Sequence, residues 1–259
     1  MKQVSRRLRL TGGFVLMAGA LFAAVLAAEL PTPPVHPHGG KLWQIVGGTC
    51  LPNMKAKHDP APCTEVDQGY VLLKDMAGVA QYLLMPDSDI TGVEDARVLT
   101  SPTNYFAAAW NARGLVETKL GKKIARDTMA VTVNSQYGRS QDLLHLHIDC
   151  LGAPARADLT SLTGVGESWS AAPVMIAGHP YYVRRVLGAE LTVNPFKLVA
   201  GELPGAKDEM RAWTIGLVGA SFDGKPGFWL LAGKADPAAG EWGSAETIQD
   251  HDCKLPLLK

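Results

Sequence analysis

One eight-residue stretch, 143–150, limits how this chain can fold more than any other. It reads Leu-Leu-His-Leu-His-Ile-Asp-Cys, so every second residue from Leu144 to Cys150 is apolar. Successive side chains of a strand point to opposite faces of the sheet, so this alternation predicts a strand with one face in the core. The other face then carries His145, His147 and Asp149, spaced about 7 Å apart. These three side chains form a candidate site.

A polar loop precedes this strand. Residues 134–141 read Asn-Ser-Gln-Tyr-Gly-Arg-Ser-Gln. Side-chain amides, hydroxyls and a guanidinium are groups that bind phosphate oxygens. The candidates for binding a substrate are therefore Asn134, Ser135, Arg139, Ser140 and Gln141.

The pattern of apolar residues before position 150 predicts an α+β fold. Strands are expected over 69–74, 80–85, 129–133 and 143–150, and a helix over 102–121. Short connections between these elements favour an antiparallel sheet with the helix packed on one face.

Residues 151–259 are expected to extend this core as a C-terminal α+β elaboration. The clearest element is a hairpin that joins 212–218 to 227–232 through Asp-Gly-Lys-Pro at 223–226. Short elements are expected over 184–187 or 190–193. No internal repeat or linker divides the chain, so 42–259 is predicted to be one domain.

The N-terminal part resembles a targeting segment. Lys2, Arg6, Arg7 and Arg9 precede an uncharged apolar run over 12–28. We expect 1–28 to be an uncleaved signal-anchor that spans the membrane once, with a cleaved signal peptide as the alternative. Basic residues before the run hold the N-terminus in the cytoplasm, so the remainder is translocated. A Pro-rich tether is expected over 29–41.

The chain has four cysteines, Cys50, Cys63, Cys150 and Cys253. All four follow the targeting segment, and an even number in an oxidising compartment predicts two disulfides. Cys50 and Cys63 bracket a short loop and form a plausible local pair, which leaves Cys150 for Cys253. Buried free thiols are the alternative. A zinc site is disfavoured because the chain has no Cys-x-x-Cys pair.

Composition excludes several classes of function. The chain has 25 basic and 25 acidic residues, so no bulk positive charge is present to hold a nucleic acid. A hydrophobic content of 47% predicts a globular chain with a substantial core. Only one apolar run is long enough to consider as a membrane span, which excludes a polytopic membrane protein.

The spacing of Asn134, Gln141, His145 and His147 resembles the central motif of the histidine-triad (HIT) superfamily of nucleotide hydrolases and transferases. A closer resemblance, covering most of 42–254, is to the CDP-diacylglycerol pyrophosphatase family. The stretches that carry it are Gln81-Tyr-Leu-Leu-Met-Pro, Pro102-Thr-Asn-Tyr-Phe with Ala109-Trp110, Asn134-Ser135, Gly138-Arg139-Ser140-Gln141, His145-x-His147 with Cys150, and Ile248-Gln-Asp-His251 with Cys253.

This resemblance implies a fold, a reaction and a location. The fold is expected to be HIT-like, and the reaction is hydrolysis of CDP-diacylglycerol to CMP and phosphatidate without a metal or other cofactor. The implied location is the bacterial inner membrane, with the catalytic domain in the periplasm. The implied partner is the lipid substrate in that membrane.

The resemblance also implies roles for individual residues. His147 matches the nucleophile that attacks the α-phosphorus and forms a cytidylyl-histidine. His145 matches the histidine that orients it, Gln141 matches a phosphate donor, and Asn134 matches the residue at the nucleotide end of the loop. Ser135, Arg139, Ser140 and Asp149 complete the expected substrate-binding set.

The sequence departs from the superfamily at several positions. Asp149 stands where the third histidine is expected, and an ionised carboxylate repels phosphate unless it is protonated or turned to a cation. Gln81 and Asp89 replace two upstream histidines, and Asp142 replaces a serine. The donor to the leaving group is therefore unassigned, with His179 and His251 as candidates.

Three alternatives compete with this interpretation. In the first, His145 and His147 are surface residues whose hydrogen bonds are satisfied and which have no role in a site. In the second, His145, His147, Asp149 and His251 hold zinc or manganese in a metal-dependent phosphodiesterase or pyrophosphatase. In the third, the chain binds a CDP-lipid without turnover.

Overall fold

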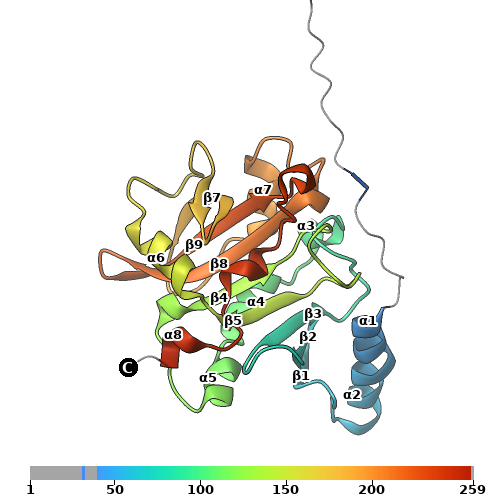
Figure 1. Cartoon of the computed structure of the whole chain (residues 1–259). Helices are drawn as coiled ribbons and strands as arrows, with labels where there is room; N and C mark the ends of the chain where they lie inside the picture. The colour runs from blue at the N-terminus through green and yellow to red at the C-terminus, as the bar shows by residue number, and fades with distance from the viewer. Residues whose placement is uncertain (1–30, 33–39, 258–259) are drawn as a thin grey trace, which may run out of the picture. The chain divides into compact units, whose positions relative to one another are not determined.

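In the described residues, nine strands form one antiparallel sheet in the order β1-β2-β3-β5-β4-β8-β9-β7-β6, shown in Figure 1. This computed structural model describes residues 31–32 and 40–257. The strands are β1 (Glu65–Asp67), β2 (Tyr70–Lys74), β3 (Tyr82–Pro86), β4 (Met129–Val133), β5 (Leu146–Cys150), β6 (Val174–Ile176), β7 (His179–Leu187), β8 (Trp213–Phe222) and β9 (Lys225–Lys234).

Short helices connect and cover these strands. The α-helices are α1 (Lys41–Ile45), α2 (Leu51–Lys57), α3 (Arg97–Thr100), α4 (Tyr105–Asn111), α5 (Gly114–Leu120), α6 (Ala153–Ser161), α7 (Pro195–Glu202) and α8 (Lys254–Leu257). A π-helical turn, η1 (Val46–Cys50), joins α1 to α2. The 3₁₀ turns are η2 (Arg126–Thr128), η3 (Met210–Ala212), η4 (Pro237–Ala239) and η5 (Ala245–Ile248). The expected α+β class is confirmed by this large antiparallel sheet and its helices.

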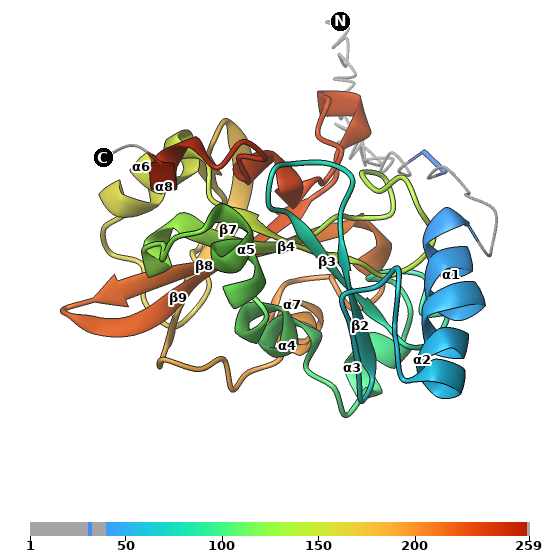
Figure 2. The same ribbon diagram turned by 90° about the horizontal axis from the view of Figure 1, so that it is seen from below.

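The two faces of the sheet are covered by different helices. Figure 2 shows α4, α5 and α7 on one face, and α6 and α8 on the other. Phe106 and Trp110 of α4 pack in the same buried cluster as Leu146 and Ile148 of β5. The even-numbered residues of β5 therefore face the core, as the alternation predicts. Its odd-numbered residues face the opposite side.

The predicted hairpins and disulfides are confirmed. β2 pairs with β3, and β8 pairs with β9 through a turn in which Asp223 and Gly224 have positive φ. This is the backbone that a tight two-residue hairpin requires. Cys50 is bonded to Cys63 and Cys150 to Cys253, so none of the four cysteines is free.

The single helix predicted over 102–121 is wrong, because the structure has two helices there. α4 ends at Asn111 and α5 begins at Gly114. Arg113 bends back so that its Nη1 donates to the Trp110 carbonyl at 2.7 Å. Asn and Gly are weak helix formers, and a side chain that takes a backbone carbonyl competes with the helix.

Other expected boundaries also differ. β5 starts at Leu146 rather than 143, because the Leu144 amide donates to the Ile90 carbonyl and leaves the ladder. The expected loop between Cys50 and Cys63 contains α2. β7 spans nine residues where only 184–187 was expected, and 190–193 is not a strand.

The expected signal-anchor, 1–28, and most of the tether lie outside the described residues. Among the helices that the structure describes, none has the length and apolar character needed to cross a membrane. The described fold begins with α1 at Lys41.

Candidate active site

The odd-numbered face of β5 is covered by a segment near the C-terminal end, Trp242–Cys253, which we call the C-terminal strap. The strap is held by backbone bonds from Ser135 N to the Gly243 carbonyl and from Gly152 N to the Ile248 carbonyl, both 2.8 Å. The disulfide from Cys253 to Cys150 attaches its far end. His145, His147 and Asp149 are consequently buried, which rules out the alternative of solvated surface histidines.

His145 is a neutral histidine with a defined tautomer. Its Nδ1 lies 2.6 Å from the Leu143 carbonyl oxygen, which only accepts, so Nδ1 carries the proton. Burial, with a further contribution from His147, lowers the pKa of His145 to about 4. The ring meets that of His147 edge to face at 5.0 Å between centroids. His145 therefore packs against His147 as an uncharged group at neutral pH.

His147 lies at the centre of the site on β5. Its Nδ1 is 2.7 Å from Gln81 Nε2 and 3.3 Å from Glu246 Oε1. Donation from Gln81 places the ring proton on Nε2, whereas donation to Glu246 leaves the Nε2 lone pair available. Nε2 is buried and has no hydrogen-bond partner among the described residues. Burial lowers the pKa of His147, which keeps the ring neutral at pH 7.

Glu246 of the C-terminal strap connects the groups of the site. Its Oε1 contacts His147 and also lies 3.4 Å from His251 Nε2, while Asn134 Nδ2 donates to its Oε2 at 3.1 Å. Burial alone raises a carboxyl pKa, but His251, His147 and Asn134 outweigh it and lower the pKa of Glu246 to about 2. Glu246 is therefore an anion at all physiological pH values.

His251 forms a cation between two carboxylates. Its Nδ1 is 2.8 Å from Asp149 Oδ2, and its Nε2 faces Glu246. The hydrogen bonds to Asp149 and Glu246 raise the pKa of His251 to about 10. Burial raises the pKa of Asp149, and the contact with His251 acts in the opposite direction. The Asp149 carboxylate thus points at a cation, His251. The sequence left two arrangements open, a protonated Asp149 or one directed at a cation, and the structure has the second.

Two of the predicted loop donors hold the C-terminal strap. Asn134 Oδ1 accepts from Ser244 Oγ and from the Glu246 amide at 3.1 and 3.2 Å, and Ser135 Oγ donates to the Trp242 carbonyl at 2.8 Å. The absence of a side chain at Gly138 lets this backbone approach, because a Cβ there would lie 2.9 Å from the carbonyl oxygens of Trp242 and Gly243. The described geometry gives Asn134 and Ser135 protein partners in place of the expected substrate.

Arg139 also has protein partners. Its guanidinium donates to both oxygens of Glu94 at 2.7 and 2.8 Å and to Asp142 Oδ1. Two carboxylates therefore occupy the fork that was expected to bind phosphate. Ser140 is exposed and Gln141 half-buried, and neither side chain hydrogen-bonds to another described residue.

Sequence reasoning missed Glu246 altogether. It lies 99 positions after His147 in a segment with no periodic pattern, so only the fold brings the two together. Gln81 belongs to a stretch that carries the family resemblance but was given no role in the site, yet its Nε2 contacts His147 and also Asp75 Oδ2 at 2.9 Å. Of the two other candidate histidines, His251 lies in the site, whereas His179 on β7 pairs with Glu241. Asp89 pairs with Arg97, away from His147.

The metal-dependent alternative gains no support from the arrangement of ligand atoms. In the part of the chain that the structure describes, only Asp149, Cys150 and Cys253 bring three such atoms close together. Both cysteines are consumed by their disulfide, so neither supplies a thiolate.

The His251 ion pair predicts a pH-dependent stability. His251 binds its proton more tightly in the folded chain, so its stabilising contribution is full below about pH 6.5, the ordinary histidine pKa. It is lost as pH rises through the folded value of about 10. We expect His251→Gln to be less stable than wild type at low pH, with the difference narrowing toward about pH 10. Urea unfolding across this range measures it, and a constant difference would contradict the ion pair.

Buried neutral histidines backed by a carboxylate, with a histidine cation beside them, form a candidate active site and point to an enzyme. Residues 37–256 match the CDP-diacylglycerol pyrophosphatase family. The chain is 39% identical over 244 residues to the CDP-diacylglycerol pyrophosphatase of Yersinia pestis, covering 92% of this chain and 93% of that protein. The chain therefore belongs to the CDP-diacylglycerol pyrophosphatase family. This confirms the resemblance at the family level and the prediction of a hydrolase.

Proposed function

We propose that this protein hydrolyses the pyrophosphate bond of CDP-diacylglycerol to CMP and phosphatidate, through a cytidylyl-histidine on His147. Family membership supports the substrate. The observation that carries the mechanism is the buried Nε2 of His147, which lacks a described partner while its Nδ1 faces the Glu246 carboxylate. This arrangement supports a neutral imidazole that attacks at Nε2 and becomes a cation stabilised by Glu246.

The proposed reaction has two steps. His147 Nε2 attacks the phosphorus that bears cytidine, the bond from that phosphorus to the bridging oxygen breaks, and phosphatidate leaves. A phosphate monoester is a weak base, so the leaving group needs little proton transfer. Water then attacks the same phosphorus, the P–N bond breaks, and one proton of the water passes to solvent. His147 returns to its neutral form and CMP is released. This mechanism uses the tautomer with the ring proton on Nδ1, directed at Glu246 throughout. The Gln81 amide, which lies 2.7 Å from Nδ1, cannot donate to that atom in this tautomer and must turn away from it.

Other residues of the site are given roles by their contacts. We assign to His251 the place of the superfamily's third histidine, because it is a cation held by Asp149 and is partly exposed. Ser140 and Gln141 are our candidates for direct contact with the phosphates. Asn134 and Arg139 instead keep the strap and the loop in position through Glu246 and Glu94.

We also infer a HIT-like core. The support is the spacing of Asn134, Gln141, His145 and His147 and the packing of α4 against β3, β4 and β5. The signal-anchor over 1–28, the tether, and an extracytoplasmic catalytic domain at the bacterial inner membrane are part of the same proposal. The basic and apolar pattern of the N-terminal residues and the two disulfides support that location.

The test is release of CMP from CDP-diacylglycerol by the purified full chain in detergent. We expect the same rate with and without excess EDTA, because no proposed step uses a metal. Loss of activity in EDTA that returns with added metal would favour the metal-dependent alternative. Binding of CDP-diacylglycerol without any CMP release would leave a lipid-binding protein.

A further inference from the structure

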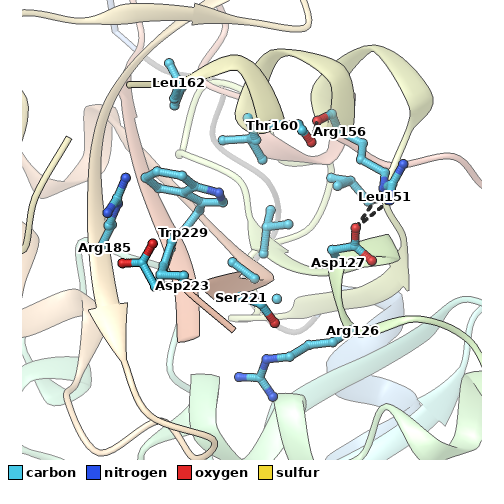
Figure 3. A pocket seen from close by; sticks show the side chains of 15 residues that line it. Arg126, Asp127, Leu151, Arg156, Thr160, Leu162, Arg185, Ser221, Asp223 and Trp229 are labelled. Carbon is cyan, nitrogen blue, oxygen red and sulfur yellow. Dashed lines mark hydrogen bonds and ion pairs between the residues drawn. The ribbon is translucent and has the colours of Figure 1, made fainter. Parts of the chain in front are cut away.

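A cavity of about 550 Å³ lies apart from the histidine site, and no residue of that site lines it. Its floor is formed by β8 and β9, including Val218, Ala220 and Trp229, and α6 forms one wall. Figure 3 shows Arg126, Arg156 and Arg185 around it, with Ser221 and Thr160 between them. The volume is within the range of small-molecule sites, about 300–1,000 Å³.

The charges on the cavity wall are unbalanced. The lining residues include three arginines and two acidic residues, Asp127 and Asp223. Arg156 forms an ion pair with Asp127, with 2.6 Å between Nη2 and Oδ2. Arg126 forms no ion pair with a described residue and donates only to backbone carbonyls, including Gly227 at 3.0 Å. Burial, with the nearby Arg113, lowers the pKa of Arg126 to about 10.

Arg185 is the least satisfied of the three. Its guanidinium lies over the rings of Phe222 and Trp229, at 4.7 and 5.3 Å from their centroids. Its Nε is buried without a hydrogen-bond partner, and no described carboxylate pairs with it. A guanidinium that lies over an aromatic ring keeps its N–H groups in its own plane, where they can donate to an anion at its edge.

We propose that this cavity binds an organic phosphate, with Arg185 holding the phosphate and Trp229 contacting an apolar or aromatic body. The fork of a guanidinium matches two phosphate oxygens, and the hydroxyl of Ser221 supplies a further donor. Asp223 lies at the turn of the β8–β9 hairpin. Its carboxylate repels negative charge, so a ligand with a second phosphate group on that side of the cavity is disfavoured. The same chemistry fits a nucleoside monophosphate or a lipid phosphomonoester.

The test uses the full chain in detergent and titration calorimetry with three probes: inorganic phosphate, CMP and a short-chain phosphatidate. Arg185→Gln is expected to weaken binding of at least one organic phosphate by about tenfold, with unchanged CMP release from CDP-diacylglycerol. The matched control is Arg184→Gln on the same strand, since Arg184 pairs with Glu202 and does not line the cavity. Arg184→Gln should bind as wild type does.

The probes identify the source of the phosphate. CMP and phosphatidate are also the proposed products of the histidine site, so only the binding that Arg185→Gln removes is assigned to the cavity. Loss of CMP binding in this variant indicates a nucleotide, and loss of phosphatidate binding indicates a lipid. Because Ser221 is exposed, Ser221→Asp provides a second variant that keeps the fold and adds a repelling charge, with the same expected loss. The proposal is overturned if neither organic phosphate binds, if Arg185→Gln and Ser221→Asp bind as wild type does, or if Arg184→Gln weakens binding equally.

Discussion

Replacement of His147 by alanine is expected to lower the rate of CMP release by about 10⁴-fold or more, the scale seen when a covalent nucleophile is removed. Glu246, Gln81 and His145 all contact the His147 ring, and alanine leaves them without the atom that attacks phosphorus. The measurement is steady-state CMP release by the full-length variant. Brief incubation with substrate labelled in the cytidine-bearing phosphate should also trap an acid-labile adduct on wild type and none on His147→Ala.

Two other histidines provide the comparison. His179→Ala should leave the rate unchanged, because this histidine pairs with Glu241 outside the site. His145→Ala should retain adduct formation with a slower rate, since His145 is proposed to orient the nucleophile. If the adduct disappears in His145→Ala and persists in His147→Ala, then His145 is the nucleophile and His147 the residue that orients it.

Removal of the Cys150–Cys253 disulfide is expected to lower the free energy of unfolding by about 4–5 kcal/mol. The bond closes a loop of 103 residues, and long loops gain more unfolded-state entropy when they are opened. Cys150→Ala with Cys253→Ala makes this change. Activity should fall as well, because the strap that carries Glu246 and His251 loses its attachment beside Asp149.

The matched control is Cys50→Ala with Cys63→Ala, which opens a loop of only 13 residues. Its expected cost is smaller, about 3 kcal/mol, and activity should persist because the loop contacts no residue of the site. Urea unfolding and CMP release are measured for both pairs. Equal losses of activity in the two variants would show that the strap does not depend on its disulfide.

The sequence predicts the part of the fold and site whose periodicity is strong. The alternation of 143–150 places Leu146 and Ile148 in the core and the two histidines on the other face, as observed. The Asp-Gly turn of the β8–β9 hairpin is likewise visible, because its backbone requires residues that tolerate positive φ.

The rest depends on long-range contacts that leave no local pattern. The strap is built of turns, so neither its position over β5 nor the role of Glu246 follows from periodicity. Arg139 shows the same dependence, because a lone guanidinium in a polar loop suggests a phosphate ligand, and only the fold brings Glu94 to it. The sequence identifies hydrogen-bond donors such as Asn134 and Arg139. It does not show that Glu246 and Glu94 are their acceptors.

The position of the strap in the chain also sets the order in which the site is completed during synthesis. His145 and His147 are translated about 100 codons before Glu246 and His251, and the contact of His251 with Asp149 spans 102 positions. A nascent or prematurely terminated chain therefore holds the two histidines without the anion and cation that arrange them. Under the proposed mechanism, the site is complete only after Cys253 has been synthesised and oxidised to its bond with Cys150 of β5.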